Sequence, residues 1–337
     1  MTAPSSVVAV VVGGVFTGSA CFSSPSTTTP LLVDKLFSWE ARAMRLKLPP
    51  TIRYTLPDYV ALLITFFTGV GVSYIHPFER PFRPDDLHIS HPHYNDWVPN
   101  GVVIAVVLIV PPVVMALFWA VRVGVDRMGW MPLNNFTSPV RPTRGNVPSF
   151  AKDLHWFMLG LLFSLATTKL FTDFLKNWAG RLRPDFLSRC LWNAALNVCT
   201  GDTETIREGR RSFPSGHTSS MFAGMGFLSI WMAGWFGVLQ NWREREVSVE
   251  EDASDGMESA VEEEFGKGWK GVLILVPLLP AFYVGISRTQ QYVHHPSDVA
   301  FGGAMGFLVS LLFYRLFYDR TGRPRGSSIR VPARRLW

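Results

Sequence analysis

Residues 287–298 read Ser-Arg-Thr-Gln-Gln-Tyr-Val-His-His-Pro-Ser-Asp, a polar stretch between two long apolar segments. Its Arg288 is a candidate anion clamp, since a guanidinium forks around phosphate or carboxylate oxygens. His294 is a candidate nucleophile, and Asp298, four residues later, is a candidate partner for the histidine ring. Taken alone, the stretch is equally well explained as a polar connector between two membrane helices.

Two upstream stretches favour chemistry over a simple connector. The first joins Lys176 to Arg183 and Pro184, seven and eight residues later. The second is Pro-Ser-Gly-His at 214–217, at the beginning of another apolar segment. Each stretch lies at the polar end of a hydrophobic segment, so we expect all three to meet at one site near a membrane surface.

The composition indicates a membrane protein. Of the 337 residues, 48% are hydrophobic and only 17% are charged. The 12 Trp and 25 Phe suit lipid-facing surfaces and interfacial belts. Much of the net charge of +6 comes from the tails and the connections between spans, which favours anchoring at the cytosolic leaflet over nucleic-acid binding.

Six apolar segments are each close to the roughly 20 residues that cross a bilayer. Because the hydrocarbon offers no water to backbone groups, each segment is predicted to be a helix. The sequence therefore predicts an all-α integral membrane fold, a bundle of six transmembrane helices. Pro277 and Pro280 predict a kink in the fifth segment. The candidate spans are 59–75, 102–123, 154–174, 218–239, 272–286 and 299–317.

The distribution of Lys and Arg predicts that both termini are cytosolic and that the three polar stretches face the lumen or the exterior. Residues 1–53 form a cytosolic tail with an amphipathic segment at 34–53, residues 54–318 form the six-span domain, and residues 319–337 form a basic cytosolic tail. The acidic stretch 240–268 is predicted to be a solvated cytosolic loop. The vacuole, endoplasmic reticulum, Golgi and plasma membrane all remain open as locations.

Smaller features carry less weight. The apolar stretch 6–22 is broken by glycines and is interpreted as part of the tail. The sequon at Asn135 lies on the predicted cytosolic side and is expected to be unused. Cys190 and Cys199 lie in a loop predicted to be outside the cytosol, where a disulfide and two free thiols are both open. The sequence has no zinc-ligand spacing, and it leaves the oligomeric state open.

The three stretches together suit a phosphate ester. Phosphoryl transfer spreads negative charge over three oxygens, and its catalysis is mainly positioning and electrostatic stabilisation. Lys176, Arg183 and Arg288 supply three cations. Ser215 and the backbone around Gly216 add donors at a helix start, where the helix dipole also favours an anion.

Two histidines divide the remaining chemistry. Asp298 is predicted to accept a hydrogen bond from one ring nitrogen of His294, which frees the other to attack phosphorus. His217 is then placed to protonate the leaving oxygen and later to activate water. The result is a phosphohistidine mechanism that uses no metal and no cofactor.

Simpler explanations exist for each residue by itself. Lys176 is also explained as a snorkelling lysine at a helix end, and the stretch 214–217 as an ordinary helix start. Arg181 competes with Arg183 as a clamp, although the spacing favours Arg183. His295 does not fit the spacing and is interpreted as a neighbour that shapes the pocket. The combination of three such stretches is what favours a catalytic site.

The chain resembles the type 2 phosphatidate phosphatase family, the membrane lipid phosphate phosphatases. All three signatures of that family are present, KxxxxxxRP at 176–184, PSGH at 214–217 and SRxxxxxHxxxD at 287–298. The surrounding Lys-Asn-Trp-Ala-Gly-Arg-Leu-Arg-Pro-Asp-Phe and His-His-Pro-Ser-Asp-Val are similar to eukaryotic members, and most of all to fungal diacylglycerol pyrophosphate phosphatases. The resemblance covers residues 54–318, specifically in the motifs and generically in the spans.

This resemblance implies a six-helix membrane bundle with a lumenal active site. It implies roles for eight residues: His294 as nucleophile, His217 as acid and base, Asp298 as the orienting carboxylate, and Lys176, Arg183, Ser215, Gly216 and Arg288 as phosphate ligands.

The expected function is therefore hydrolysis of phosphatidate, diacylglycerol pyrophosphate or lysophosphatidate in a bilayer. A sphingoid-base or polyisoprenyl phosphate phosphatase and a phosphoryl transferase are alternatives within the same fold. A transporter of anionic lipids would explain the cations but not the paired histidines. A vanadate-dependent peroxidase would share the anion cradle, but its usual soluble setting conflicts with six spans.

Overall fold

The computed structural model describes residues 50–128, 150–239, 267–319, 322 and 324–325. The chain divides into two units, Met1–Pro57 and Asp58–Trp337, and the second unit carries all three motifs. The apolar stretch 6–22, most of the amphipathic segment 34–53, the sequon at Asn135 and the acidic residues of 240–266 lie outside the described residues.

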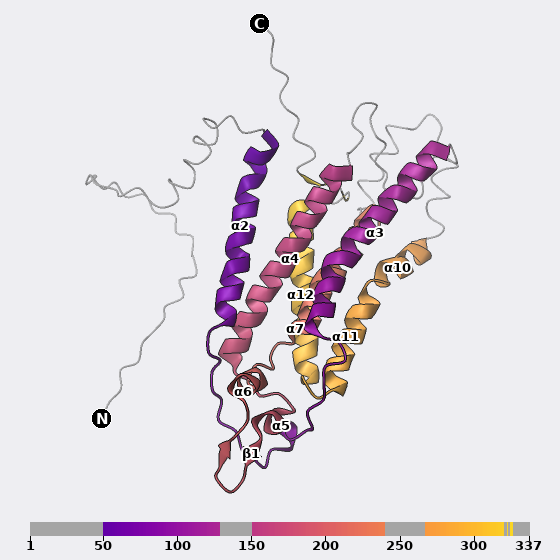
Figure 1. The fold of residues 1–337 in the computed structure, drawn as a ribbon. Coiled ribbons are helices and arrows are strands. Elements are labelled where there is room, and N and C mark those ends of the chain that lie inside the picture. The colour runs from indigo at the N-terminus through magenta and orange to yellow at the C-terminus, as the bar shows by residue number, and fades with distance from the viewer. Residues whose placement is uncertain (1–49, 129–149, 240–266, 320–321, 323, 326–337) are drawn as a thin grey trace, which may run out of the picture. The chain divides into compact units, whose positions relative to one another are not determined.

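Seven helices of the described residues lie outside the connections between the apolar segments, and most of them run alongside one another in Figure 1. They are α2 (Pro50–Ser73), α3 (Asn100–Met128), α4 (Phe150–Ala179), α7 (Gly216–Trp235), α10 (Lys267–Leu275), α11 (Leu278–Gln290) and α12 (Pro296–Phe317). The described residues are thus mostly helical, as the apolar segments predict.

Four of these helices are long and apolar enough to cross a membrane, namely α2 from Thr55, α3 to Gly124, α4 and α12. A fifth span results if α10 and α11 are counted together, with a bend of 42° between them. The bend follows Leu275 and lies beside Pro277 and Pro280, which lack the N–H groups that a continuous helix needs. The predicted kink is confirmed.

Helix α7 corresponds to the remaining predicted span but is not among these apolar helices. Its first residues are Gly-His-Thr-Ser-Ser, which lower its mean hydropathy. Most of its residues are buried, because α3, α4, α11 and α12 all pack against it. A helix that is surrounded by protein does not need a lipid-facing surface.

Glycines allow the helices around α7 to approach closely. A Cβ at Gly224 of α7 would lie 2.7 Å from the Cβ of Val107 on α3. A Cβ at Gly306 of α12 would overlap the backbone carbonyl of Ser219. Small residues serve the same purpose in other membrane bundles, where close packing replaces the hydrophobic effect as the cause of association.

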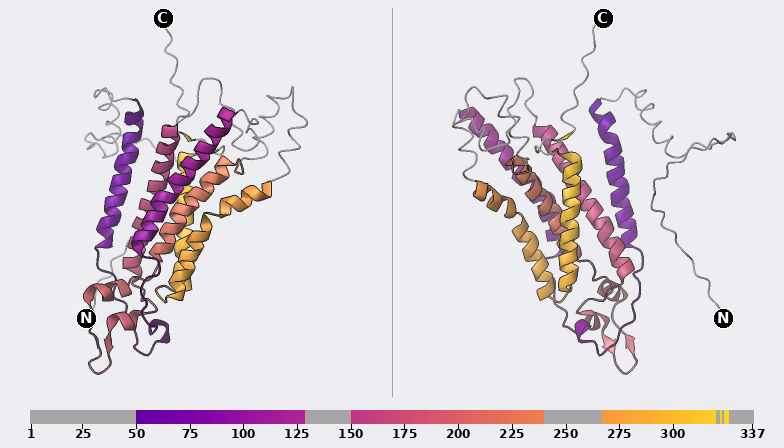
Figure 2. Two further views of the ribbon diagram at one scale, coloured as in Figure 1. Left: turned by 45° about the vertical axis from the view of Figure 1, so that its right-hand side comes forward. Right: turned by 180° about the vertical axis from the view of Figure 1, so that it is seen from behind.

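A compact cap covers one end of the bundle, and the three views in Figures 1 and 2 agree on its place. Most of it is the connection from α4 to α7, and Cys190 and Cys199 form a disulfide within it. A short 3-10 helix, Leu87–Ile89, belongs to the connection from α2 to α3. The elements of the α4–α7 connection are α5 (Phe186–Cys190), β1 (Trp192–Asn193), β2 (Val198–Cys199) and α6 (Thr203–Gly209), and β1 pairs antiparallel with β2 with Trp192 opposite Cys199.

Candidate active site

Backbone hydrogen bonds join the three motif stretches under this cap. The amide of Ser212, just before the PSGH stretch, donates to the carbonyl of Arg181 at 2.9 Å. The amide of Ser215 donates to the carbonyl of Asp298 at 3.1 Å. The ends of α4 and α12 therefore both meet the start of α7, as the sequence predicts.

Gly180 sets the direction of the first motif. It follows the last residue of α4 and has a φ of +53°, in the left-handed region that favours glycine. A Cβ at this position would overlap the carbonyl of Phe78. The turn at Gly180 leads the chain away from α4 and back across the bundle end, which brings Arg181 and Arg183 to the other motifs.

The PSGH stretch forms the N-terminus of α7. Ser215 occupies the N-cap position, is fully buried, and pairs through its Oγ with Thr218 Oγ1 at 3.0 Å. A Cβ added to Gly216 would lie 3.4 Å from the amine nitrogen of Lys176. A lysine amine thus lies beside a helix N-terminus, and both attract an anion.

A cavity of about 390 Å³ opens beside these groups. Arg183 and His217 line it, together with Val293, the residue before His294. Two carboxylates from outside the motifs, Asp96 and Glu208, also line it. This cavity is the candidate active site.

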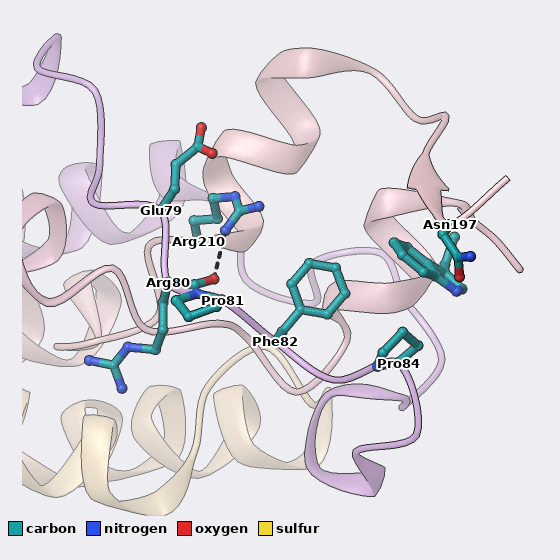
Figure 3. Close-up of a pocket in the computed structure, with 8 residues that line it drawn as sticks. Glu79, Arg80, Pro81, Phe82, Pro84, Asn197 and Arg210 are labelled. Atoms are coloured by element: carbon teal, nitrogen blue, oxygen red, sulfur yellow. Dashed lines mark hydrogen bonds between the residues drawn. The ribbon is translucent and has the colours of Figure 1, made fainter.

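A larger cavity of about 510 Å³ lies elsewhere in the cap, beside Phe82 and Arg210 (Figure 3). Arg210 there donates to the backbone carbonyl of Arg80 at 3.2 Å, the bond drawn as a dashed line. No residue of the three motifs lines this cavity. Size alone therefore does not identify the site, and the smaller cavity is the one that the motif residues Arg183, His217 and Val293 line.

His217 is held in one tautomer. Its Nε2 lies 3.1 Å from the carbonyl oxygen of Val98, and because a carbonyl only accepts, Nε2 carries the hydrogen. Its Nδ1 is then the nitrogen with a free lone pair. Burial and the positive charge of Arg288 lower the pKa of His217 from 6.5 to about 4, so the ring is neutral near pH 7.

His294 and Asp298 are both buried, with His294 Nδ1 3.8 Å from Asp298 Oδ2. This distance is too long for the predicted hydrogen bond. Nδ1 has no hydrogen-bond partner among the described residues. Burial lowers the pKa of His294 well below its usual value, which keeps the ring neutral.

Asp298 instead binds groups in or beside all three motif stretches. Arg181 Nη1 donates to its Oδ1 at 2.7 Å, and Ser212 Oγ donates to its Oδ2 at 2.6 Å. The backbone amide of His295 donates to Oδ2 at 3.1 Å. Arg181, which competes with Arg183 as a clamp on sequence grounds, is thus occupied by Asp298.

Arg183 and Arg288, the two arginines predicted to clamp phosphate, also have carboxylate partners. Arg183 Nη2 lies 3.1 Å from Glu208 Oε2, and Arg288 Nη1 lies 2.9 Å from Asp96 Oδ1. Arg288 Nη2 also donates to Gln291 Oε1 at 2.7 Å. Arg183 keeps a buried Nε without a hydrogen-bond partner in the described part of the chain, so a donor is left over for a ligand.

Glu208 is an ionised group inside a cationic cluster. Its burial opposes ionisation, but the charges of Lys176, Arg183 and Arg211 outweigh burial and lower its pKa to about 2. Arg211 also lies 3.3 Å from Asp173 of α4. Sequence reasoning did not identify Glu208 or Asp96, since neither belongs to a motif and only the folded cap brings them to the cavity.

Comparison with known proteins identifies the family. Residues 157–322 match the PAP2 superfamily. The chain is 30% identical to Diacylglycerol pyrophosphate phosphatase 1 of Saccharomyces cerevisiae, over 81% of this chain and 82% of that protein. It is also 30% identical to Lipid phosphate phosphatase 2 of Arabidopsis thaliana, over 81% of each chain. No solved structure matches it.

A probable diacylglycerol pyrophosphate phosphatase 1 of Schizosaccharomyces pombe is 31% identical over 77% of this chain and 80% of the relative. These matches and the apolar helices define a multi-pass membrane phosphatase. The chain belongs to the PAP2 superfamily and, within it, to the lipid phosphate phosphatases, which confirms the resemblance drawn from the motifs.

Proposed function

We propose that this phosphatase hydrolyses lipid phosphates in the bilayer, namely phosphatidate, diacylglycerol pyrophosphate or lysophosphatidate, through a phosphohistidine intermediate and without a metal ion. The observation that carries the proposal is the meeting of Lys176, Arg183, His217 and His294 at one end of the bundle. Relatives whose names include diacylglycerol pyrophosphate and lipid phosphate support the choice of substrate.

The phosphoryl group would bind where the free donors converge. The amine of Lys176 lies beside the backbone at the start of α7, and Arg183, whose charge acts on Lys176, has an unpaired Nε. Arg288 completes the set when a phosphate oxygen competes with Asp96 for its guanidinium. Fixed cations of this kind stabilise the charge on the equatorial oxygens in the transition state.

In the first step, His294 attacks phosphorus. Its Nδ1 faces Asp298, so Nδ1 carries the hydrogen and Nε2 carries the attacking lone pair. The Nε2–P bond forms as the bond from phosphorus to the leaving oxygen breaks. The negative charge of the bound phosphate raises the pKa of His217 above its value in the free protein, so the ring enters this step protonated and gives its Nδ1 proton to a leaving alkoxide. The gap of 3.8 Å to Asp298 shortens as the ring becomes positive, because catalytic hydrogen bonds tighten when substrate binds.

In the second step, water attacks the phosphohistidine. Neutral His217 accepts the water proton while the N–P bond breaks, which releases orthophosphate and restores neutral His294. The low pKa of His217 suits this role, because the ring is unprotonated and ready as a base near pH 7.

The proposed topology has six spans, with α7 as the fourth and the cap outside the cytosol. The disulfide between Cys190 and Cys199 in the cap supports this side, since disulfides persist in oxidising compartments. The exposed apolar faces of α2 and α3 support contact with lipid. Acyl chains would then stay between the helices while the headgroup enters the cavity.

Metal independence is tested separately from the choice of nucleophile. Among the described residues, no group of three or more His, Cys, Asp or Glu side chains is arranged to hold a metal ion. We expect the purified protein in detergent micelles to release phosphate from phosphatidate in the presence of a chelator. Loss of release with chelator, restored by a divalent metal, would contradict this part of the proposal.

The nucleophile is tested with His294→Ala, for which we expect at least a ~1,000-fold loss of activity. The control is His88→Ala, which changes an exposed histidine of the same cap. When the reaction with a substrate that carries a radioactive phosphate is quenched rapidly, the wild-type protein should retain an acid-labile radioactive phosphoryl group. The His294→Ala variant should retain none. A label that survives the His294 substitution would overturn the mechanism.

A further inference from the structure

A buried carboxylate anchors two further side chains that line the candidate catalytic cavity. Asp185 is fully buried, and both its oxygens accept from Arg189 Nε at 2.8 Å. His93 Nδ1 lies 2.7 Å from Asp185 Oδ2. Arg189 and His93 both line the cavity that Arg183 and His217 line. None of these three residues belongs to the catalytic assignment above.

The anchoring leaves the cationic end of Arg189 available. Asp185 engages only Nε, and the terminal nitrogens of Arg189 have no hydrogen-bond partner among the described residues. His93 must carry a hydrogen on Nδ1, because a carboxylate only accepts, and this bond fixes its ring plane. An arginine that lines a cavity, is held at Nε and has unpaired terminal nitrogens is prepared for a second anion.

Arg189 also faces the same space as the clamp Arg183. After burial, the positive charge of Arg189 is the largest cause that lowers the pKa of Arg183. Two guanidinium groups that repel each other and line one cavity are stabilised together by a ligand with more than one negative group. A single phosphate in the catalytic cradle would bind Arg183 but would leave the terminal nitrogens of Arg189, whose Nε is held by Asp185, without a hydrogen-bond acceptor.

We propose that Arg189, positioned by Asp185 and with His93 beside it, forms a second anion subsite that binds the inner phosphate of a lipid pyrophosphate headgroup. The inference rests on the proposed function and adds a preference for substrates with two linked phosphates. The terminal phosphoryl group goes to His294, the bridging P–O bond breaks, and the electron pair stays on the inner phosphate. That phosphate leaves as a phosphate monoester, and Arg189 stabilises its added charge.

Binding tests the subsite without turnover. The full-length protein in detergent is titrated by calorimetry with orthophosphate, which occupies one position, and with methylenediphosphonate, a pyrophosphate analogue that cannot be hydrolysed. We expect the wild type to bind methylenediphosphonate at least ~10-fold more tightly. In Arg189→Gln the two affinities should differ by less than ~2-fold, with orthophosphate affinity unchanged.

Because Arg189→Gln leaves Asp185 buried without its cation, the double variant Asp185→Asn/Arg189→Gln is measured beside it. The matched control is Arg207→Gln, since Arg207 of α6 pairs with Glu204 at 2.8 Å and does not line the cavity. We expect the control to keep the wild-type difference. An equal loss of affinity for orthophosphate and methylenediphosphonate, or no loss of affinity in either Arg189 variant, would show that Arg189 does not bind a second phosphate. Either result would overturn the proposed subsite.

Activity separates this inference from the proposed function. With matched acyl chains, the ratio of kcat/KM for diacylglycerol pyrophosphate to that for phosphatidate should fall at least ~10-fold in Arg189→Gln and stay constant in Arg207→Gln. A wild type that releases no phosphate from either lipid contradicts the proposed function, and the calorimetric comparison still decides the subsite.

Discussion

Asp298 has a different set of partners from the one its motif suggests. Its two carboxylate oxygens are bound by Arg181 and Ser212, at 2.7 and 2.6 Å, whereas His294 Nδ1 is 3.8 Å away. Arg181 and Ser212 come from the first two motif regions, so they hold the carboxylate of the third in place. In the proposed mechanism they are positioning residues, because they would act on His294 only through Asp298.

Ser212→Ala should therefore lower kcat about 10-fold while KM changes little, since one charge-assisted hydrogen bond to Asp298 is lost. Asp298→Asn should lower kcat further, because it removes the charge that stabilises the His294 imidazolium. The measurement is phosphate release from micellar phosphatidate over a range of substrate concentrations.

Ser188→Ala is the matched control for Ser212→Ala. Ser188 Oγ donates to the carbonyl of His91 at 2.8 Å in the same cap and does not contact Asp298. Equal losses in the two serine variants would show that Ser212 contributes only to the stability of the cap.

The lowered pKa of His217 predicts how the stability of the folded protein depends on pH. The folded value of about 4 lies below the ordinary value of 6.5, so the unfolded chain takes up the proton first as the pH falls. The contribution of His217 to the stability is therefore fully present above pH 6.5 and is lost as the pH falls toward 4. His217→Asn should reduce the fall in Tm over this window, measured by thermal unfolding in detergent.

His294 contributes in the same direction, since burial also lowers its pKa, so one substitution removes only part of the dependence. Tm curves of wild type and His217→Asn that run parallel between pH 6.5 and 4 would contradict a lowered pKa for His217. The His88→Ala variant, exposed in the cap, should reproduce the wild-type curve.

At the scale of elements, α12 carries Asp298 against the start of α7, and Gly302 permits that contact. A Cβ at Gly302 would lie 2.7 Å from the backbone carbonyl of Ser215, closer than real Cβ atoms approach. Gly302→Ala should cost about 1–3 kcal/mol of stability, as overpacking does. It should also displace the PSGH turn, so activity should fall more than stability alone explains. Thermal unfolding and phosphate release are measured on the same preparation.

Gly71→Ala on α2 is the matched control, because nothing lies within 4 Å of a Cβ placed there. We expect it to leave activity unchanged and to maintain or slightly raise the Tm, since alanine favours a helix over glycine. If the two alanine variants behave alike, the close contact between α12 and α7 does not constrain the site.

The elements differ in how far the sequence predicts them. The break between α10 and α11 is predictable because Pro277 and Pro280 remove backbone donors, a local effect. The place of α7 at the centre of the bundle is not predictable in this way. Its glycines and serines lower its mean hydropathy, and their role in close packing depends on the helices that contact them.

At the scale of the whole molecule, the sequence predicts which motif stretches meet but not what their side chains bind. Local spacing places Lys176, Arg183, His217 and His294 at helix ends, and the bundle brings those ends together. The pairing of Arg288 with Asp96 spans 192 positions, and no periodicity indicates it. Glu208 likewise reaches Arg183 only because the cap folds over the bundle end.

The side of the membrane that the cap faces is the last consequence of this arrangement. If the cap is outside the cytosol, Leu87→Cys, at a position that is 79% exposed in the cap, should react with a membrane-impermeant maleimide only from that side. Ser327→Cys in the basic C-terminal tail should react only from the cytosol. Both substitutions are made in a Cys21→Ser background, so that Cys21 does not contribute signal. In sealed microsomes with the cytosolic face outward, Ser327→Cys should be labelled at once and Leu87→Cys only after permeabilisation. The reverse pattern would place the cavity in the cytosol, and labelling of both before permeabilisation would put the two positions on one side, which is incompatible with the proposed topology.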